Sequence, residues 1–464
     1  MPFSPNAADE AQALRTAVEK VDRGDFATVR KLLDHAGWNA LETLFWNASH
    51  PLRASASRAF HEYIDLAQLL WTRLGAGTRE PLCAYRQALD SPPMVDAMLR
   101  ILARLYAGCN LAYSPPPQGF WRTVYAITGY LLSRSRDNPD VFARELNYCM
   151  QLWLMAWLNP LSLVAGRLPV AVQLIGVLSK SCTFSLAPPT HAGSGLAAAD
   201  LADDRGPIPF PRLPDDWSPE LPLYVNAQSA AYAIEALHAS AAASTKGDVY
   251  ETLLGTGRSV GLSSSEVRDF VKRALREFGQ SRARSKPRVP ATGALSTVVG
   301  FIELWTALDE HSHASDVQKA KSQAGLRAEL VNHTDGGFLL RYRISEPRLR
   351  AGTLMGMRAT EAEPWILTVI RWLQDNGSDV LVGVEVLNNY PRRDLATPDD
   401  RPTQAPIIYF ENDDGRQIFL PLGHADPGSV CQMNVGDEIW VTSVVQELGD
   451  DWEMRLLLDT LPRR

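Results

Sequence analysis

The spacing of apolar residues changes along the chain, and this change restricts the fold to helices followed by strands. Up to about residue 180, apolar side chains recur at steps of three and four, which places them on one face of a helix. One such stripe comprises Val95, Met98, Leu99, Leu102, Leu105 and Tyr106. From Val289 onward, short apolar runs are bounded by glycine, asparagine and charged turns, a pattern typical of an antiparallel barrel or sandwich. The sequence therefore predicts a multidomain α + β protein.

The length of the chain, 464 residues, is enough for several domains, since one domain typically takes about 100 to 200 residues. Two segments rich in proline and short of large apolar residues are predicted to be linkers. We expect an N-terminal helical bundle and two β-rich parts, with these bounds: a helical module over 1–186, a linker over 187–222, a helical pair over 223–281, a β-barrel over 282–390, a linker over 391–406 and a small β-domain over 407–464.

Individual elements follow from the same patterns. The helical pair is expected at 228–243 and 263–278. A glycine-containing turn at 412–415 predicts a hairpin in the last domain. The pattern leaves open whether the last strands form a barrel of their own or pack on the preceding one, and we take them as a separate domain. The barrel strands are expected at 297–308, 328–331, 337–344, 353–357, 365–372 and 380–386.

The composition narrows the classes of partner. A formal net charge of -7 argues against duplex nucleic acid, because binding a phosphate backbone normally requires a basic face. The five cysteines are odd in number and widely spaced, which indicates reduced thiols and a cytoplasmic location. The N-terminus lacks the pattern of a secretory signal.

A largely apolar stretch over 150–178 is expected to form buried helices. Asn159-Pro160, Arg167 and Pro169 interrupt it, and these residues are costly in a membrane span. Peripheral attachment to a membrane machine is the alternative. His311-Ser312-His313 has a spacing that could hold a metal, but a solvated loop explains it better, so we assign no metal site. No motif for a catalytic residue is found, and the chain is not expected to be an enzyme.

Two short motifs lie near the start of the strand-rich part, one just before it and one within it. The first is Arg284-Ser285-Lys286-Pro287-Arg288, with two arginines four residues apart, and the second is Asn332-His333-Thr334-Asp335-Gly336-Gly337. Together they resemble the signature of the PilZ family, which is written RxxxR followed by (D/N)x(S/A)xxG. The resemblance covers residues 282–387, and Thr334 stands where the family usually has serine or alanine.

The resemblance implies a six-stranded antiparallel β-barrel that binds cyclic di-GMP and needs no cofactor. Carried over by position, the ligand-binding residues are Arg284, Arg288, Asn332, Thr334 and Gly337, with Arg282 and Lys286 as possible additions. Arginine suits this ligand because its planar guanidinium group donates hydrogen bonds to guanine or phosphate. The flat face of the same group stacks on a base.

We therefore expect a bacterial signalling protein in which cyclic di-GMP binding changes the arrangement of domains and regulates a partner. The helical module, which has no chemistry of its own, is expected to dock a protein partner. The alternative is a scaffold that binds no ligand and uses a degenerate PilZ-like barrel as an interaction surface. Arg288→Ala separates the two, because only a receptor has nucleotide binding to lose.

Overall fold

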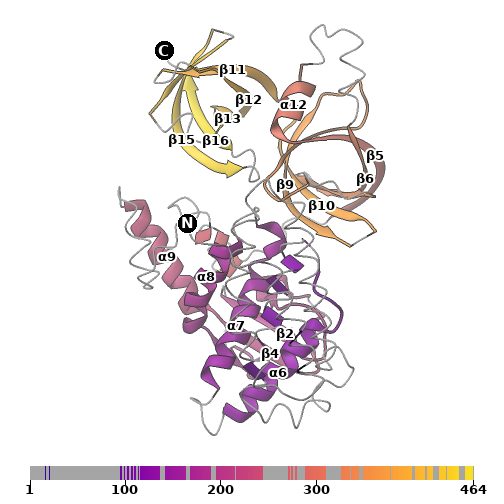
Figure 1. Ribbon diagram of the computed structural model, residues 1–464, viewed down its shortest axis with the longest axis vertical. Coiled ribbons are helices and arrows are strands. Elements are labelled where there is room, and N and C mark those ends of the chain that lie inside the picture. The colour runs from indigo at the N-terminus through magenta and orange to yellow at the C-terminus, as the bar shows by residue number, and fades with distance from the viewer. Residues whose placement is uncertain are drawn as a thin grey trace. The chain divides into compact units, whose positions relative to one another are not determined.

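The computed structural model describes most of residues 113–243 and 288–462, together with scattered positions between 16 and 110 and between 270 and 278 (Figure 1). The gaps within the two main ranges are 114, 136–141, 164–167, 190–194, 215, 310–324, 335, 344–348, 377, 400–402, 413–414, 422–427, 435 and 449–454. The chain forms two compact units, one comprising residues 1–160 and 166–285 and the other comprising 161–165 and 286–464.

The first unit has a helical part whose core is aromatic. The rings of Phe120, Trp121, Tyr125 and Trp153 contact one another in series, with centroids 5.1, 5.8 and 5.1 Å apart. Burial raises the pKa of the Cys149 thiol in the same core to about 12, which keeps it protonated. The helical elements described between residues 120 and 243 are α6 Phe120–Ser135, α7 Ala143–Trp157, η1 Pro160–Ser162, α8 Leu168–Leu178, η2 Ser179–Ser181, η3 Phe210–Arg212 and α9 Gln228–Ala243.

The first unit also contains a sheet, where the sequence had predicted a linker over 187–222. Its antiparallel strands have the order β1-β4-β2-β3, and the prolines in it do not prevent pairing. Pro209 lies on the edge strand β3 and Pro222 is the first residue of β4, the two places where a strand tolerates a missing N–H. The bounds are β1 Thr183–Ser185, β2 Leu196–Asp200, β3 Ile208–Pro209 and β4 Pro222–Asn226.

The predicted linker also caps a helix. The Asp204 carboxylate accepts hydrogen bonds from the backbone N–H groups of Gly119 and Arg122 at the start of α6, the latter at 3.2 Å. A carboxylate at this end satisfies free N–H donors and lies at the positive end of the helix dipole. The hydroxyl of Tyr125 donates to the Arg205 carbonyl. These contacts order a segment that has few large apolar residues.

The second unit begins with a closed barrel of six antiparallel strands in the order β10-β7-β6-β5-β8-β9, which confirms the predicted fold (Figure 1). Inside this first barrel, the Tyr342 hydroxyl lies 3.0 Å from the Thr297 Oγ1 and 3.3 Å from the Met355 sulfur. Burial raises the pKa of Tyr342 to about 12. The strands are β5 Val289–Val299, β6 Leu326–Thr334, β7 Gly337–Tyr342, β8 Leu354–Arg358, β9 Ile366–Asp375 and β10 Val380–Asn388.

The strand predicted over 297–308 is wrong in its second half. Strand β5 ends at Val299, Gly300 takes a positive φ of 109°, and helix α12 follows at Phe301–Ala307. The apolar residues after Gly300 have strand-like propensity, but their spacing places Phe301, Leu304 and Ala307 on one buried helix face. The turn at Gly300 is what separates strand from helix.

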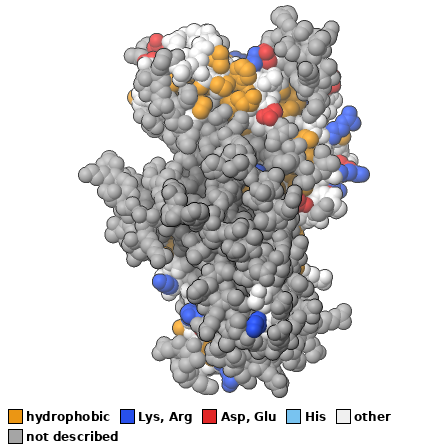
Figure 2. Space-filling model, in the orientation of Figure 1, with side chains coloured by type: hydrophobic (Ala, Val, Ile, Leu, Met, Phe, Trp, Pro, Cys, Tyr) orange, Lys and Arg blue, Asp and Glu red, His pale blue; other side chains and the backbone are white. Residues whose placement is uncertain are grey.

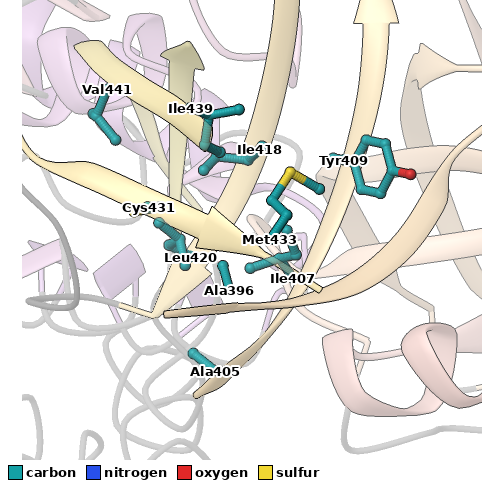
Figure 3. Close-up of a cluster of buried hydrophobic side chains, with 10 residues drawn as sticks. All are labelled: Ala396, Ala405, Ile407, Tyr409, Ile418, Leu420, Cys431, Met433, Ile439 and Val441. Atoms are coloured by element: carbon teal, nitrogen blue, oxygen red, sulfur yellow. The ribbon is translucent and has the colours of Figure 1, made fainter. Parts of the chain in front are cut away.

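A second closed barrel of six antiparallel strands follows, in the order β11-β12-β13-β16-β15-β14. Figure 3 shows part of its buried core, which includes Ile407, Leu420 and Met433. Strand β11 lies within the predicted linker 391–406, and its Pro398 is the last residue of the strand, paired with Cys431. The strands are β11 Arg392–Pro398, β12 Ala405–Asn412, β13 Gly415–Pro421, β14 Val430–Met433, β15 Glu438–Leu448 and β16 Arg455–Pro462.

Helix α12 packs between the two barrels (Figure 1). The Trp305 Nε1–H donates to the Asp394 carbonyl of β11 at 3.1 Å, and the Arg393 guanidinium lies over the Trp305 ring at 4.2 Å from its centroid. Arg393 also forms an ion pair with Asp309. The buried cluster around the helix comprises Phe301, Leu304, Ala307, Leu354, Trp365, Leu367, Val369, Ile408, Phe410 and Phe419. The last strands therefore form a barrel of their own that also packs on the first.

Candidate ligand-binding site

The second motif lies at the end of β6 and the start of β7, in the hairpin that joins them. Asn332 is paired with Leu339 and Thr334 with Gly337, and all four residues are partly or fully covered. Because side chains alternate along a strand, Asn332 and Thr334 lie on the same face of β6. Asp335, between these residues in the chain, lies outside the described residues.

The end of the first motif lies beside the second. Arg288 directly precedes β5 and is exposed, and in the next residues Val289 is paired with His333 and Pro290 with Asn332. The strand register therefore brings the backbone of Arg288 to the end of β6 that carries Asn332 and Thr334, although 44 positions separate Arg288 from Asn332 in the sequence (332 minus 288). Arg282, Arg284 and Lys286 lie outside the described residues.

Gly337 allows a close approach of two strands. A Cβ atom at this position would lie 2.3 Å from the Val384 carbonyl oxygen of β10, a distance at which the backbone would have to move. Beside it, the Val386 N–H donates to the Gly336 carbonyl at 3.0 Å. The Thr334 hydroxyl lies 3.5 Å from the Gly337 carbonyl, at the long limit for donating to it. The missing side chain of Gly337 thus allows the hairpin to lie close to β10.

The strand pairing extends the site across two further strands. Asn332 is paired with Leu339, Leu339 with Gly383, and Gly383 with Trp372 of β9. A Cβ atom on Gly383 would lie 2.1 Å from the Trp372 Nε1, so the indole lies directly over this glycine. We call the four residues Asn332, Leu339, Gly383 and Trp372 the lateral row.

Trp372 and Gly383 were not predicted as site residues. The signal available in the sequence was a glycine inside an apolar strand. Such a glycine often marks a place where another group approaches the backbone closely. An indole that lies flat on a sheet and is only partly covered presents a surface on which a base can stack.

Most charged side chains around the lateral row are paired. Arg371 forms an ion pair with Glu385, whose backbone is paired with Gly337. Arg343 lies 2.6 Å from Glu329, and Arg341 lies 3.2 Å from Asp379. On the face seen in Figure 2, the described lysine and arginine side chains form small scattered groups.

Other kinds of site find no support in the described part of the chain. Among those residues, no group of three or more His, Cys, Asp or Glu is placed to hold a metal ion, and His311 and His313 lie outside them. None of the helices described is both long enough and apolar enough to cross a membrane.

Comparison with known proteins supports the family resemblance of the first barrel. A search of curated proteins gave no match. Residues 305–391 match the family model described as "Cyclic-di-GMP receptor FimW, middle PilZ domain". The matched segment contains the second motif and strands β6 to β10, and it ends before β11. Residues 305–391 are therefore similar to a PilZ domain, which confirms the resemblance that the two motifs had indicated.

Proposed function

We propose that this chain is a cyclic di-GMP receptor and that the nucleotide binds the outward face of the first barrel at the lateral row. The observation that supports this most strongly is the register of β5 and β6. It brings the backbone of Arg288, the last residue of the first motif, beside the end of β6 that carries Asn332 and Thr334. The matched family, described as a cyclic di-GMP receptor, supports the same ligand.

The chemistry of the ligand suits the residues of this face. Arg288 bonds a phosphate or the O6 and N7 edge of a guanine, and the Asn332 amide bonds a second guanine edge. Arg284, with Arg282 and Lys286 as additional contacts, supplies positive charge from the segment before β5. Trp372 provides a flat surface for a guanine ring. Gly337 acts indirectly, because it keeps the hairpin against β10.

The response to the ligand is part of the same proposal. The ligand draws the segment of residues 284–288 onto the first barrel, and the helices that precede this segment change their arrangement. A protein partner docks on the helical module and responds to that change. The receptor is bacterial and cytoplasmic, acts by binding and not by catalysis, and associates peripherally with a membrane machine if its partner resides there.

A scaffold that binds no nucleotide is the second candidate. The observation that favours it is the position of the Thr334 hydroxyl, which lies 3.5 Å from the Gly337 carbonyl. A hydroxyl that donates within its own hairpin has only its lone pairs left for a ligand.

Calorimetric titration of cyclic di-GMP into the full chain tests the proposal. We expect saturable binding that Arg284→Ala/Arg288→Ala abolishes. Arg343→Ala is the matched control, because Arg343 is on the same barrel, is 79% exposed and pairs with Glu329. Absence of binding by the wild-type chain would reject the receptor and leave the scaffold.

A further inference from the structure

The two barrels have the same connectivity. When the strands of each barrel are numbered in chain order, the first barrel reads 1-2-3-6-5-4 around its circumference, and so does the second. All neighbouring strands are antiparallel in both. Helix α12 is an insertion between strands 1 and 2 of the first barrel, and no helix is assigned between β11 and β12 among the residues described there.

The correspondence extends to single residues. In each barrel two residues join strands 2 and 3, and the pair next to this turn is Thr334 with Gly337 in the first barrel and Asn412 with Gly415 in the second. Counting from this pair makes Phe410 the counterpart of Asn332.

The counterpart of the lateral row follows from the next pairings. Phe410 is paired with Gln417, Gln417 with Asp459, and Asp459 with Ser443. Both barrels also have a β-bulge next to this row on strand 5, with the extra residue Arg371 in one and Thr442 in the other. A shared bulge at one register position is a specific feature and argues that the barrels are two copies of one fold.

The side chains of the lateral row differ at all four positions between the two barrels. In the order Asn332, Leu339, Gly383 and Trp372, the second barrel has Phe410, Gln417, Asp459 and Ser443. It therefore lacks the amide, the glycine and the indole of the first, and its sequence has an acidic residue in the place of Gly383. The residues immediately before β11, Asn388-Asn389-Tyr390-Pro391, include no arginine.

The outward face of the second hairpin is already occupied. Phe410 is 3% exposed, and together with Ile408 and Phe419 it belongs to the buried cluster around helix α12. Arg393 stacks on Trp305, and Arg416, on the inner side of β13, is held by Glu411 at 2.9 Å and by Asp437 at 2.8 Å. These two arginines of the second barrel are therefore committed to contacts within the protein.

We propose that the second barrel is a copy of the first in which the nucleotide-binding face has become a docking surface for helix α12. This barrel binds the first barrel and no nucleotide. The part of the proposal that concerns nucleotide rests on the proposed function, because it compares the second barrel with a site on the first. The part that concerns docking rests on the buried cluster alone.

Titration of cyclic di-GMP into the full chain tests the nucleotide part. We expect Arg284→Ala/Arg288→Ala to remove all binding and Arg416→Ala to leave affinity and stoichiometry as in the wild type. Residual saturable binding in the double variant that disappears when Arg416→Ala is added would overturn the inference. No binding in the wild type would instead reject the proposed function, and the docking part would then be judged by the next experiment.

Limited proteolysis and thermal unfolding of the full chain test the docking part. Phe410→Ala is compared with Trp440→Ala, which removes an aromatic side chain that is 47% exposed on the same barrel. We expect Phe410→Ala to lower the melting temperature and to speed cleavage in residues 388–391 by about tenfold through local opening, with little change in Trp440→Ala. Equal behaviour of the two variants would overturn the docking surface.

A gentler variant keeps this test valid if Phe410→Ala does not fold. Trp305→Phe retains an aromatic ring but loses the Nε1–H that donates to the Asp394 carbonyl. Cleavage between the barrels should again be faster than in Trp440→Ala, with the strand content measured by circular dichroism unchanged. Wild-type cleavage in Trp305→Phe would contradict docking through α12.

Discussion

Gly383 and Trp372 are paired across β10 and β9, and the indole of the tryptophan occupies the space that a side chain at the glycine would need. This pairing turns one end of the lateral row into a flat aromatic surface. At the other end of the row, the register of β5 brings Arg288 close to Asn332. The site that we propose has a charged end and a stacking end on one face of a small barrel.

Removing the indole should weaken cyclic di-GMP binding without unfolding the barrel. Stacking of one base on an aromatic side chain contributes about 1–3 kcal/mol, so Trp372→Ala should raise the Kd by about tenfold or more. Gly383→Ala should also raise the Kd, because the added Cβ atom displaces the Trp372 indole. Calorimetric titration measures both, with Trp440→Ala as the control. An unchanged Kd in Trp372→Ala would remove the indole from the site.

The two adjacent glycines of the hairpin should respond differently to alanine. Gly337→Ala puts a Cβ atom 2.3 Å from the Val384 carbonyl oxygen, whereas a Cβ atom on Gly336 meets no heavy atom within 4 Å. Forcing a side chain into such a contact typically costs about 1–3 kcal/mol. We predict a clearly lower free energy of unfolding for Gly337→Ala in urea and a nearly normal value for Gly336→Ala. Similar stabilities would show that the hairpin can move away from β10.

Stability of the first barrel should depend on the ionisation of Tyr342 at high pH. Burial raises its pKa to about 12 in the folded state, above the ordinary value of 10.0, so folding favours the neutral phenol. The stability that comes from this hydroxyl is complete below pH 10.0 and is lost as the pH rises toward about 12. Tyr342→Phe loses the contact with Thr297, at a cost of about 1 kcal/mol at neutral pH.

The comparison that checks this effect is urea unfolding of wild type and Tyr342→Phe across the same pH range. The advantage of the wild type should shrink above pH 10.0. Other buried tyrosines, such as Tyr125, contribute equally to both proteins, so the difference between the two isolates Tyr342. A difference that stays constant through this range would be inconsistent with a buried phenol.

The helix cap supplied by the predicted linker should be measurable. Asp204→Ala removes the acceptor for two N–H groups at the start of α6 and should destabilise the first unit by about 1 kcal/mol. Asp204→Asn keeps an acceptor oxygen and should lose less. Thermal unfolding of the three proteins compares them, and equal melting temperatures would mean that water replaces the carboxylate at no cost.

Local patterns in the sequence were enough to predict antiparallel strands and the position of the hairpin, and the family resemblance implied the six-stranded barrel. The short apolar runs that end at turns correspond to strands, and Asn332 and Thr334 lie on one face because they are two residues apart. The helix predicted over 228–243 has these bounds in the structure.

The elements that were missed depend on contacts made at long range. Helix α12 has a composition that suits a strand, and its packing against Ile408 and Phe410 stabilises the helical form. The segments over 187–222 and 391–406 are ordered by pairing with strands elsewhere in the chain, which composition does not reveal. The lateral row requires three strand registers at once, so Trp372 was not identified from its sequence neighbours.

Hydrogen–deuterium exchange of the full chain with and without saturating cyclic di-GMP tests the central claim most directly, because the second barrel provides an internal control. We predict that the nucleotide slows exchange in the residues before β5 and in the β6–β7 hairpin, and leaves the corresponding β12–β13 hairpin unchanged. Slowed exchange at β12–β13 without any change at β6–β7 would show that the ligand binds the second barrel. That result would contradict the proposed site on the first barrel.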